Sequence, residues 1–175
     1  MRLIKGFLFV ASGFLILITC ISLLIPSRVM TAKTVVIHAQ PQRILAAIND
    51  LQAWKKWHPV LKIDSSSVLI SNPSTGVNAS AEWSSSNKIN NIIITGVIPQ
   101  GIKFSLIRPG ENPVENTLTY MPLQEAGTYQ VEWKALTKLK WYPWEKFAGI
   151  FVGEITGPGY EVALTALKNY TEQHQ

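Results

Sequence analysis

Phe7 to Ile25 is a run of nineteen residues without a charged side chain, and it constrains the chain more than any other feature. Leucine, isoleucine, phenylalanine and valine occupy most of its positions. A helix of this length extends about 30 Å, the thickness of the hydrocarbon core of a bilayer. Pro26 ends the run, and the rest of the chain is far more polar. The expected division is an N-terminal tail (1–6), a transmembrane helix (7–25), a tether (26–30) and one soluble domain (31–175).

Two alternatives to an uncleaved anchor fit the sequence less well. A cleaved signal peptide has a shorter apolar core and ends in a small-residue cleavage site, which Ile25-Pro26-Ser27-Arg28 does not provide. Leu17-Ile18-Thr19-Cys20 only partly resembles a lipoprotein box, because threonine precedes the cysteine and largely apolar residues follow it. The run is therefore interpreted as the anchor of a single-pass membrane protein.

The charges that flank the run give a weaker indication of orientation. Arg2 and Lys5 precede it and favour a cytoplasmic N-terminus, which would place the domain on the extracytoplasmic side. Arg28 and Lys33 on the other side oppose this orientation.

The composition limits the possible functions. The net charge of +5 comes from basic residues that are mostly scattered singly, whereas nucleic-acid binding needs them clustered on one face. Cys20 is the only cysteine, which excludes an intrachain disulfide and a cysteine-based zinc or redox site. No nucleic-acid partner and no cofactor are expected.

Alternating apolar and polar residues predict about seven strands in the domain. Such alternation is typical of an antiparallel sheet with one covered face and one solvated face. The predicted strands are Val29–His38, Val68–Ile70, Val77–Trp83, Ile89–Ile98, Ile102–Leu106, Thr117–Tyr120 and Thr128–Ala135.

Helical spacing predicts short helices from Pro41 and over Leu51–Trp57, and a long amphipathic helix at the C-terminus. Phe147, Ile150 and Phe151 share one helical face, and Gly157-Pro158-Gly159 is expected to break the helix. The simplest α+β arrangement lays the terminal helix across the apolar face of the sheet.

Several segments in a characteristic order resemble the START/Bet v 1-like superfamily, specifically its bacterial polyketide cyclase/dehydrase-like (SRPBCC) branch. They are Val35–Pro41, Trp54–Pro59, Glu82-Trp83, Gly127–Trp133 and Gly157–Tyr160 leading to Ala166-Leu167-Lys168. The resemblance implies a helix-grip fold, in which a curved antiparallel sheet wraps around the long C-terminal helix and encloses an apolar cavity. Many members of this branch carry an N-terminal span, so the resemblance implies a single-pass protein of the bacterial inner (cell) membrane. Ser84-Ser85-Ser86-Asn87 departs from the glycines that the family often has there.

The inward phase of the strands, together with the second helix, supplies the candidate ligand-binding residues. Large aromatic side chains would face the terminal helix, and small alanines would leave room, as in an apolar small-molecule pocket. The candidates are Trp54, Trp57, His58, Ala79, Ala81, Trp83, Phe104, Leu118, Tyr120, Tyr129, Val131, Trp133 and Leu164. The alternative is that these residues only fill a core. Likewise, Trp54 and Trp57 either roof the cavity or wedge their helix against the sheet.

No catalytic motif or metal-ligand spacing is present, and His38, His58 and His174 are scattered. Glu82 and Glu132 fall on the polar phase of their strands and are expected to be surface carboxylates. Lys134 to Trp144 combines three lysines with three aromatic residues, a composition favoured at a membrane interface. It would contact headgroups, gate the cavity, or simply pack as a loop.

Three functions remain as hypotheses. The first is a membrane-anchored module that binds an apolar or amphipathic small molecule, such as a lipid, without transforming it. The second is an enzyme of the polyketide cyclase/dehydrase type, which works through pocket shape and one or two polar groups. The third is a structural or interaction protein whose cavity is filled.

Overall fold

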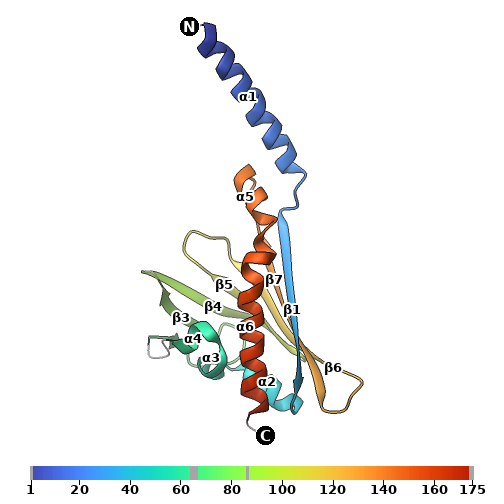
Figure 1. The fold of residues 1–175 in the computed structure, drawn as a ribbon. Coiled ribbons are helices and arrows are strands. Elements are labelled where there is room, and N and C mark those ends of the chain that lie inside the picture. The colour runs from blue at the N-terminus through green and yellow to red at the C-terminus, as the bar shows by residue number, and fades with distance from the viewer. Residues whose placement is uncertain (1, 64–66, 86, 174–175) are drawn as a thin grey trace.

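A computed structural model describes residues 2–63, 67–85 and 87–173 and shows an α+β domain below a projecting helix (Figure 1). The elements are α1 (Arg2–Leu23), β1 (Arg28–His38), α2 (Pro41–Asn49), α3 (Leu51–Trp57), α4 (Pro59–Ile63), β2 (Leu69–Ile70), β3 (Ser80–Ser85), β4 (Lys88–Ile98), β5 (Gly101–Ile107), β6 (Val114–Pro122), β7 (Thr128–Lys138), α5 (Pro143–Gly149) and α6 (Val152–Glu172). His174 and part of the turn at Ser84–Asn87 lie outside the described residues.

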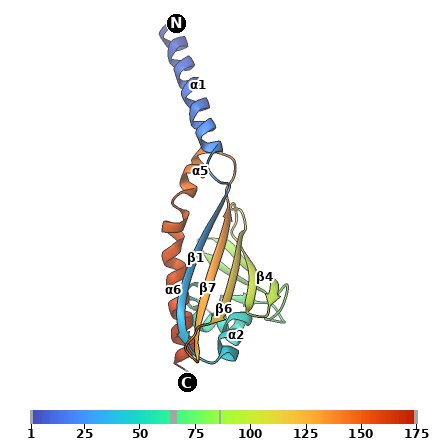
Figure 2. The same ribbon diagram turned by 90° about the vertical axis from the view of Figure 1, so that its right-hand side faces the viewer.

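The apolar run forms α1, which extends away from the domain (Figures 1 and 2). Its segment Ile4–Leu23 has a mean hydropathy of 2.4 and is long and apolar enough to span a membrane. The helix begins before the apolar run and ends two residues before Ile25. The chain then reaches β1 through Leu24–Ser27, so β1 includes the last residues of the expected tether.

Seven antiparallel strands form one curved sheet in the order β1-β7-β6-β5-β4-β3-β2, which confirms the predicted fold class. β1 and β7 pair along their full lengths, from Arg28 opposite Lys138 to His38 opposite Thr128. Sequential neighbours from β2 to β7 are joined by short connections, and only β1 pairs with a strand distant in sequence.

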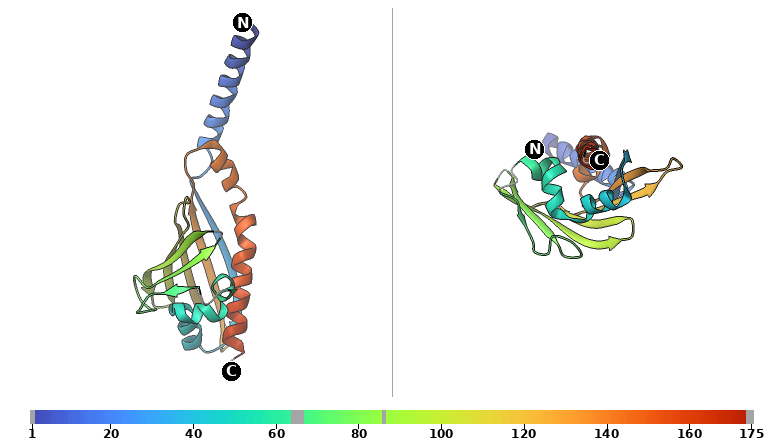
Figure 3. Two further views of the ribbon diagram at one scale, coloured as in Figure 1. Left: turned by 90° about the vertical axis from the view of Figure 1, so that its left-hand side faces the viewer. Right: turned by 90° about the horizontal axis from the view of Figure 1, so that it is seen from below.

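The helices α2, α3, α4 and α6 lie on the concave face of the sheet, which curves around them (Figure 3). α6 runs alongside β1 and buries Ala163, Leu164 and Leu167. α2 covers part of β5 and β6. The core therefore lies between the sheet and this layer of helices.

The prediction of a helix break at Gly157-Pro158-Gly159 is wrong, because α6 continues through it from Val152 to Glu172. Proline inside a helix removes one backbone hydrogen bond. Packing outweighs this loss. Gly157 is buried against β1, where an added Cβ would lie 2.9 Å from the Cε atom of Lys33. Lys33 also forms an ion pair with Glu161, one turn further along α6.

Two other local predictions also differ from the structure. Val77 was expected to begin a strand, but it is exposed, and β3 begins only at Ser80. The backbone turns at Asn78, whose φ is 70°. No helix was predicted directly after Leu51–Trp57, but Pro59 follows it on a new helix. It begins α4, because proline is well suited to the first turn of a helix.

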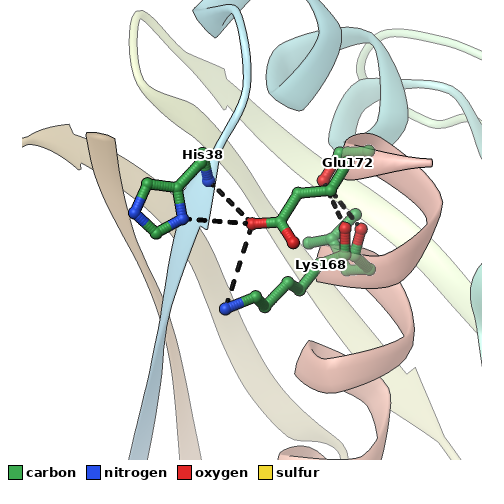
Figure 4. A network of polar contacts seen from close by, with 5 residues as sticks. His38, Lys168 and Glu172 are labelled. Carbon is green, nitrogen blue, oxygen red and sulfur yellow. Dashed lines mark hydrogen bonds and ion pairs between the residues drawn. The ribbon is translucent and has the colours of Figure 1, made fainter. Parts of the chain in front are cut away.

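The C-terminal end of α6 is tied to the end of β1 by Glu172 (Figure 4). Its Oε1 accepts a hydrogen bond from the backbone N–H of His38 at 2.8 Å and lies 3.4 Å from His38 Nδ1. Lys168 Nζ lies 3.9 Å from the same oxygen. These contacts hold the lower half of the helix against the strand.

Candidate functional site

A cavity of about 300 Å³ lies between the concave sheet, the end of α3, α4 and the first half of α6. Four of the thirteen candidates from the sequence line it: His58, Trp83, Phe104 and Trp133. The other lining residues are Val60, Ile92, Leu106, Arg108, Asn116, Ile155, Thr156, Gly159, Tyr160 and Ala163.

The remaining nine candidates are part of the core or pack against it. Their side chains are used in packing between the sheet and the helices, so they do not line the cavity. They are Trp54, Trp57, Ala79, Ala81, Leu118, Tyr120, Tyr129, Val131 and Leu164. Glu82 and Glu132 do not line the cavity either, and Glu132 pairs with Lys134 at 2.7 Å.

Trp133 of β7 is the centre of the aromatic lining. Its ring centroid lies 5.1 Å from that of Tyr160 and 5.6 Å from that of Phe104. Its Nε1–H donates to Asn116 Oδ1 at 2.9 Å, and Asn116 Nδ2 donates to the carbonyl of Val114 at 2.8 Å. The polar atoms of this pair are thus satisfied within the protein, and the indole can present an apolar surface to a ligand.

Trp54 and Trp57 hold α3 against α2. Their Nε1–H groups donate to the carbonyls of Ile48 at 2.8 Å and of Ala47 at 3.0 Å. Both indoles are buried, with 0% and 2% of their surface exposed. Neither indole lines the cavity, and both pack into the core. The ring of Trp54 also stacks on His58, with centroids 5.4 Å apart and planes 6° apart.

His58 gives the cavity wall a buried, neutral polar group. Burial lowers the pKa of its imidazole from 6.5 to about 4, because the charged form loses its hydration. Among the described residues, its Nδ1 has no hydrogen-bond partner. The imidazole is therefore uncharged at neutral pH.

Tyr160 and Arg108 supply the other main polar groups. Burial raises the pKa of the Tyr160 phenol, and the charge of Arg108 partly opposes this shift. The Arg108 side chain is about half exposed and lies 3.4 Å from Glu111. The cavity thus combines aromatic and aliphatic walls with a few polar groups, an arrangement suited to an apolar or amphipathic ligand.

Sequence reasoning missed the wall that α6 contributes. Ile155, Thr156, Gly159, Tyr160 and Ala163 follow one another at intervals of one, three, one and three residues, which places them on one helical face. The expected break at Pro158 divided this pattern in two. Continuing the helical period across the proline would have revealed it.

Within residues 2–63, 67–85 and 87–173, no three histidine, cysteine, aspartate or glutamate side chains come together as a possible metal site.

Comparison with known proteins identifies the fold. No protein-family model and no curated protein sequence matches the chain. Among solved structures, a START superfamily protein from Mycobacterium smegmatis is 17% identical, with a TM-score of 0.60 over 83% of this chain and 99% of that one. A protein from Nitrosospira multiformis is 16% identical, with a TM-score of 0.61 over 84% and 100%. Aha1 from Colwellia psychrerythraea is 17% identical, with a TM-score of 0.54 over 82% and 96%.

The similarity extends over nearly the whole length of each of these three proteins, and at such low identity it establishes the fold alone. It agrees with the curved antiparallel sheet and the long C-terminal helix. The protein therefore has a START-like, helix-grip fold.

Proposed function

We propose that this protein is a membrane-anchored module that binds an apolar or amphipathic small molecule, such as a lipid, in the cavity between the sheet and α6. In this proposal α1 anchors the chain in the bacterial cell membrane, with the domain on the extracytoplasmic side. The cavity of about 300 Å³ carries the argument. Its size is at the lower end of the range of about 300–1,000 Å³ that is usual for ligand sites.

The small residues of α6 support the proposal over a filled cavity. Gly159 lines the cavity, and a Cβ added there would meet no heavy atom within 4 Å. The helix therefore has open space where a larger side chain would fit. Glycine is also a poor helix former, less favourable than leucine by up to about 1 kcal/mol. Helix stability therefore does not explain why residue 159 is glycine.

Mass spectrometry of molecules retained by the full-length protein tests this proposal. Wild type and Gly159→Leu would be purified in the same mild detergent, so that lipids bound around α1 appear equally in both. A molecule enriched in the wild type and lost from Gly159→Leu is expected. Gly153→Ala is the matched control, because Gly153 lies on the same helix but does not line the cavity. Equal retention by all three proteins would contradict the proposal.

A second candidate is an enzyme of the polyketide cyclase/dehydrase type, favoured by the neutral His58 on the cavity wall. A neutral imidazole can accept a proton from a bound substrate, although a pKa near 4 makes it a weak base. His58→Gln separates the two candidates. An enzyme would lose turnover of the retained molecule, whereas a binding module would show no turnover in either protein.

A further inference from the structure

The end of the domain next to α1 carries a group of exposed apolar side chains. We call this group the α5 surface. Each of its side chains is between 36 and 75% exposed. They come from the segment before α5, from α5 itself, from the connection between α5 and α6, and from the first turn of α6. They are Trp141, Trp144, Phe147, Ile150, Phe151 and Ile155.

The opposite face of α5 is held in place, which explains why these side chains point outward. Gly149 is buried against Leu139, so closely that an added Cβ would lie 2.1 Å from Leu139 Cδ1. Lys146, on the same helix, is only 3% exposed. The ring of Tyr142 packs between Trp141 and Trp144, with both centroid distances at 5.0 Å. The exposure is therefore a consequence of how the helix is seated.

α5 is also bound to the point where α1 ends. The Nζ of Lys146 donates to the carbonyl of Ile25 at 2.8 Å and to Ser27 Oγ at 2.5 Å. The backbone N–H of Leu139 donates to the carbonyl of Ser27 at 2.8 Å. α5 contacts α1 directly and lies immediately below it (Figure 2). These contacts connect the tether to the α5 surface.

We propose that the α5 surface lies in the headgroup region of the bilayer that α1 spans, and that it holds the domain against the membrane. This inference rests on the membrane anchoring proposed above. The 20 residues of Ile4–Leu23 extend about 30 Å as a helix, which fills the hydrocarbon core and leaves α5 at its boundary. Tryptophan and tyrosine are enriched at that depth.

The charges at this end of the domain fit the same partner. Arg28 and Lys138 are opposite each other at the start of β1 and the end of β7, and Lys140 follows two residues later. Lys138 forms an ion pair with Glu115 at 2.6 Å, so Arg28 and Lys140 are the basic side chains considered for the bilayer. Basic side chains near a bilayer attract anionic headgroups. The exposed apolar side chains therefore carry the match to the bilayer, and Arg28 and Lys140 add to it.

The proposed docking also orients the cavity. Ile155 belongs to the α5 surface and is one of the residues that line the cavity. With the α5 surface in the headgroup region, the end of the α6 wall that contains Ile155 faces the lipid. A molecule could then pass between the bilayer and the cavity without crossing a long path through water.

Tryptophan quenching in nanodiscs tests the inference with the full chain. The nanodiscs would contain phosphatidylcholine with phosphatidylglycerol and a phosphatidylcholine that carries a doxyl label either near the headgroup or deep in the chain. Wild type would be compared with Trp141→Phe/Trp144→Phe, which retains four of the six tryptophans. Three of these four, Trp54, Trp57 and Trp133, are at most 3% exposed. Circular dichroism would check that both proteins have the same fold.

We expect the shallow label to quench the tryptophan fluorescence of the wild type more strongly than the deep label does. We also expect the double variant to lose most of this quenching. If both proteins enter the nanodiscs and are quenched equally, the α5 surface does not lie in the headgroup region, while the anchoring by α1 stands. Failure of the wild type to enter nanodiscs would overturn the anchoring and this inference together. Ligand retention is measured separately, so neither result decides the proposed binding function.

Discussion

The two halves of α6 meet the same sheet in different ways. In the C-terminal half, Leu164, Leu167 and Thr171 are almost completely buried. In the N-terminal half, Ile155 and Gly159 are exposed and line the cavity. One uninterrupted helix thus has a packed half, from Leu164 onward, and an open half, up to Ala163. The comparison shows that the packed half can hold the fold while the open half leaves room for a ligand.

Local composition explains the difference. The packed half carries leucines at helical spacing and is tied to β1 through Glu172 and His38. On the cavity face of the open half, Gly159 has no side chain and Ala163 has only a methyl group. Because these two positions do not fill the space that the curved sheet leaves, a cavity remains beside Tyr160.

Truncation in the packed half should have the largest effect on stability. Leu167 is fully buried, so Leu167→Ala should lower the free energy of unfolding by about 2–5 kcal/mol through lost burial and a new cavity. Val162→Ala is the control, because Val162 lies on the same helix and is 58% exposed. Denaturant titration of the full chain in detergent measures both. A similar decrease in the free energy of unfolding in both variants would contradict the assignment of Leu167 to a buried face of α6 and of Val162 to an exposed face.

The pH dependence of the free energy of unfolding tests whether the His58 side chain on the cavity wall is shielded from water. The folded-state pKa of His58 is about 4, against 6.5 in the unfolded chain. Between these values the unfolded chain binds more protons, so the free energy of unfolding should rise with pH. The stability lost as pH falls from 6.5 to 4 should be roughly 3 kcal/mol, from about 1.4 kcal/mol per pKa unit.

The variant His58→Gln removes this titrating group and is the control for the pH experiment. Its stability should change with pH by roughly 3 kcal/mol less than that of the wild type over the same range. Parallel pH profiles for the two proteins would show that the His58 side chain is hydrated in the folded state, contrary to the buried wall described above.

The seat of α5, beside the open half, should be sensitive to a single methyl group. Gly149→Ala would place a Cβ 2.1 Å from Leu139 Cδ1, and either α5 or Leu139 must move. The expected cost is about 1–3 kcal/mol. In Gly153→Ala the new Cβ would make an ordinary contact with Thr31 Oγ1 at 3.7 Å, so its stability should change little. Equal thermal stability of the two variants would show that α5 is loosely seated.

The sheet could be predicted from the sequence because its signal is local. Alternation along Thr128–Ala135 and Ile102–Leu106 defines the covered face without knowledge of the partner strands. The terminal helix from Tyr160 onward was predictable for the same reason, since its apolar residues recur at helical spacing. The order of these segments then carried the resemblance to the START-like fold.

The site was harder to predict because it depends on how elements pack. Leu118 and Val131 point to the same side of the sheet as Phe104 and Trp133, but only the latter two reach the cavity. The positions of α2 and α3 decide which inward residues are covered. The alternation of apolar and polar residues along the strands does not specify where these helices lie. Arg108 follows the end of β5 and shows no pattern at all.

Ligand retention in matched variants of the two halves is the most direct test of the account. Gly159→Leu changes the open half, and Leu167→Ala changes the packed half. The account predicts that Gly159→Leu loses the retained molecule and keeps its stability. It also predicts that Leu167→Ala keeps the molecule, measured well below its unfolding temperature, and loses stability. Retention by Gly159→Leu at the wild-type level would contradict the claim that the open half of α6 forms the binding site.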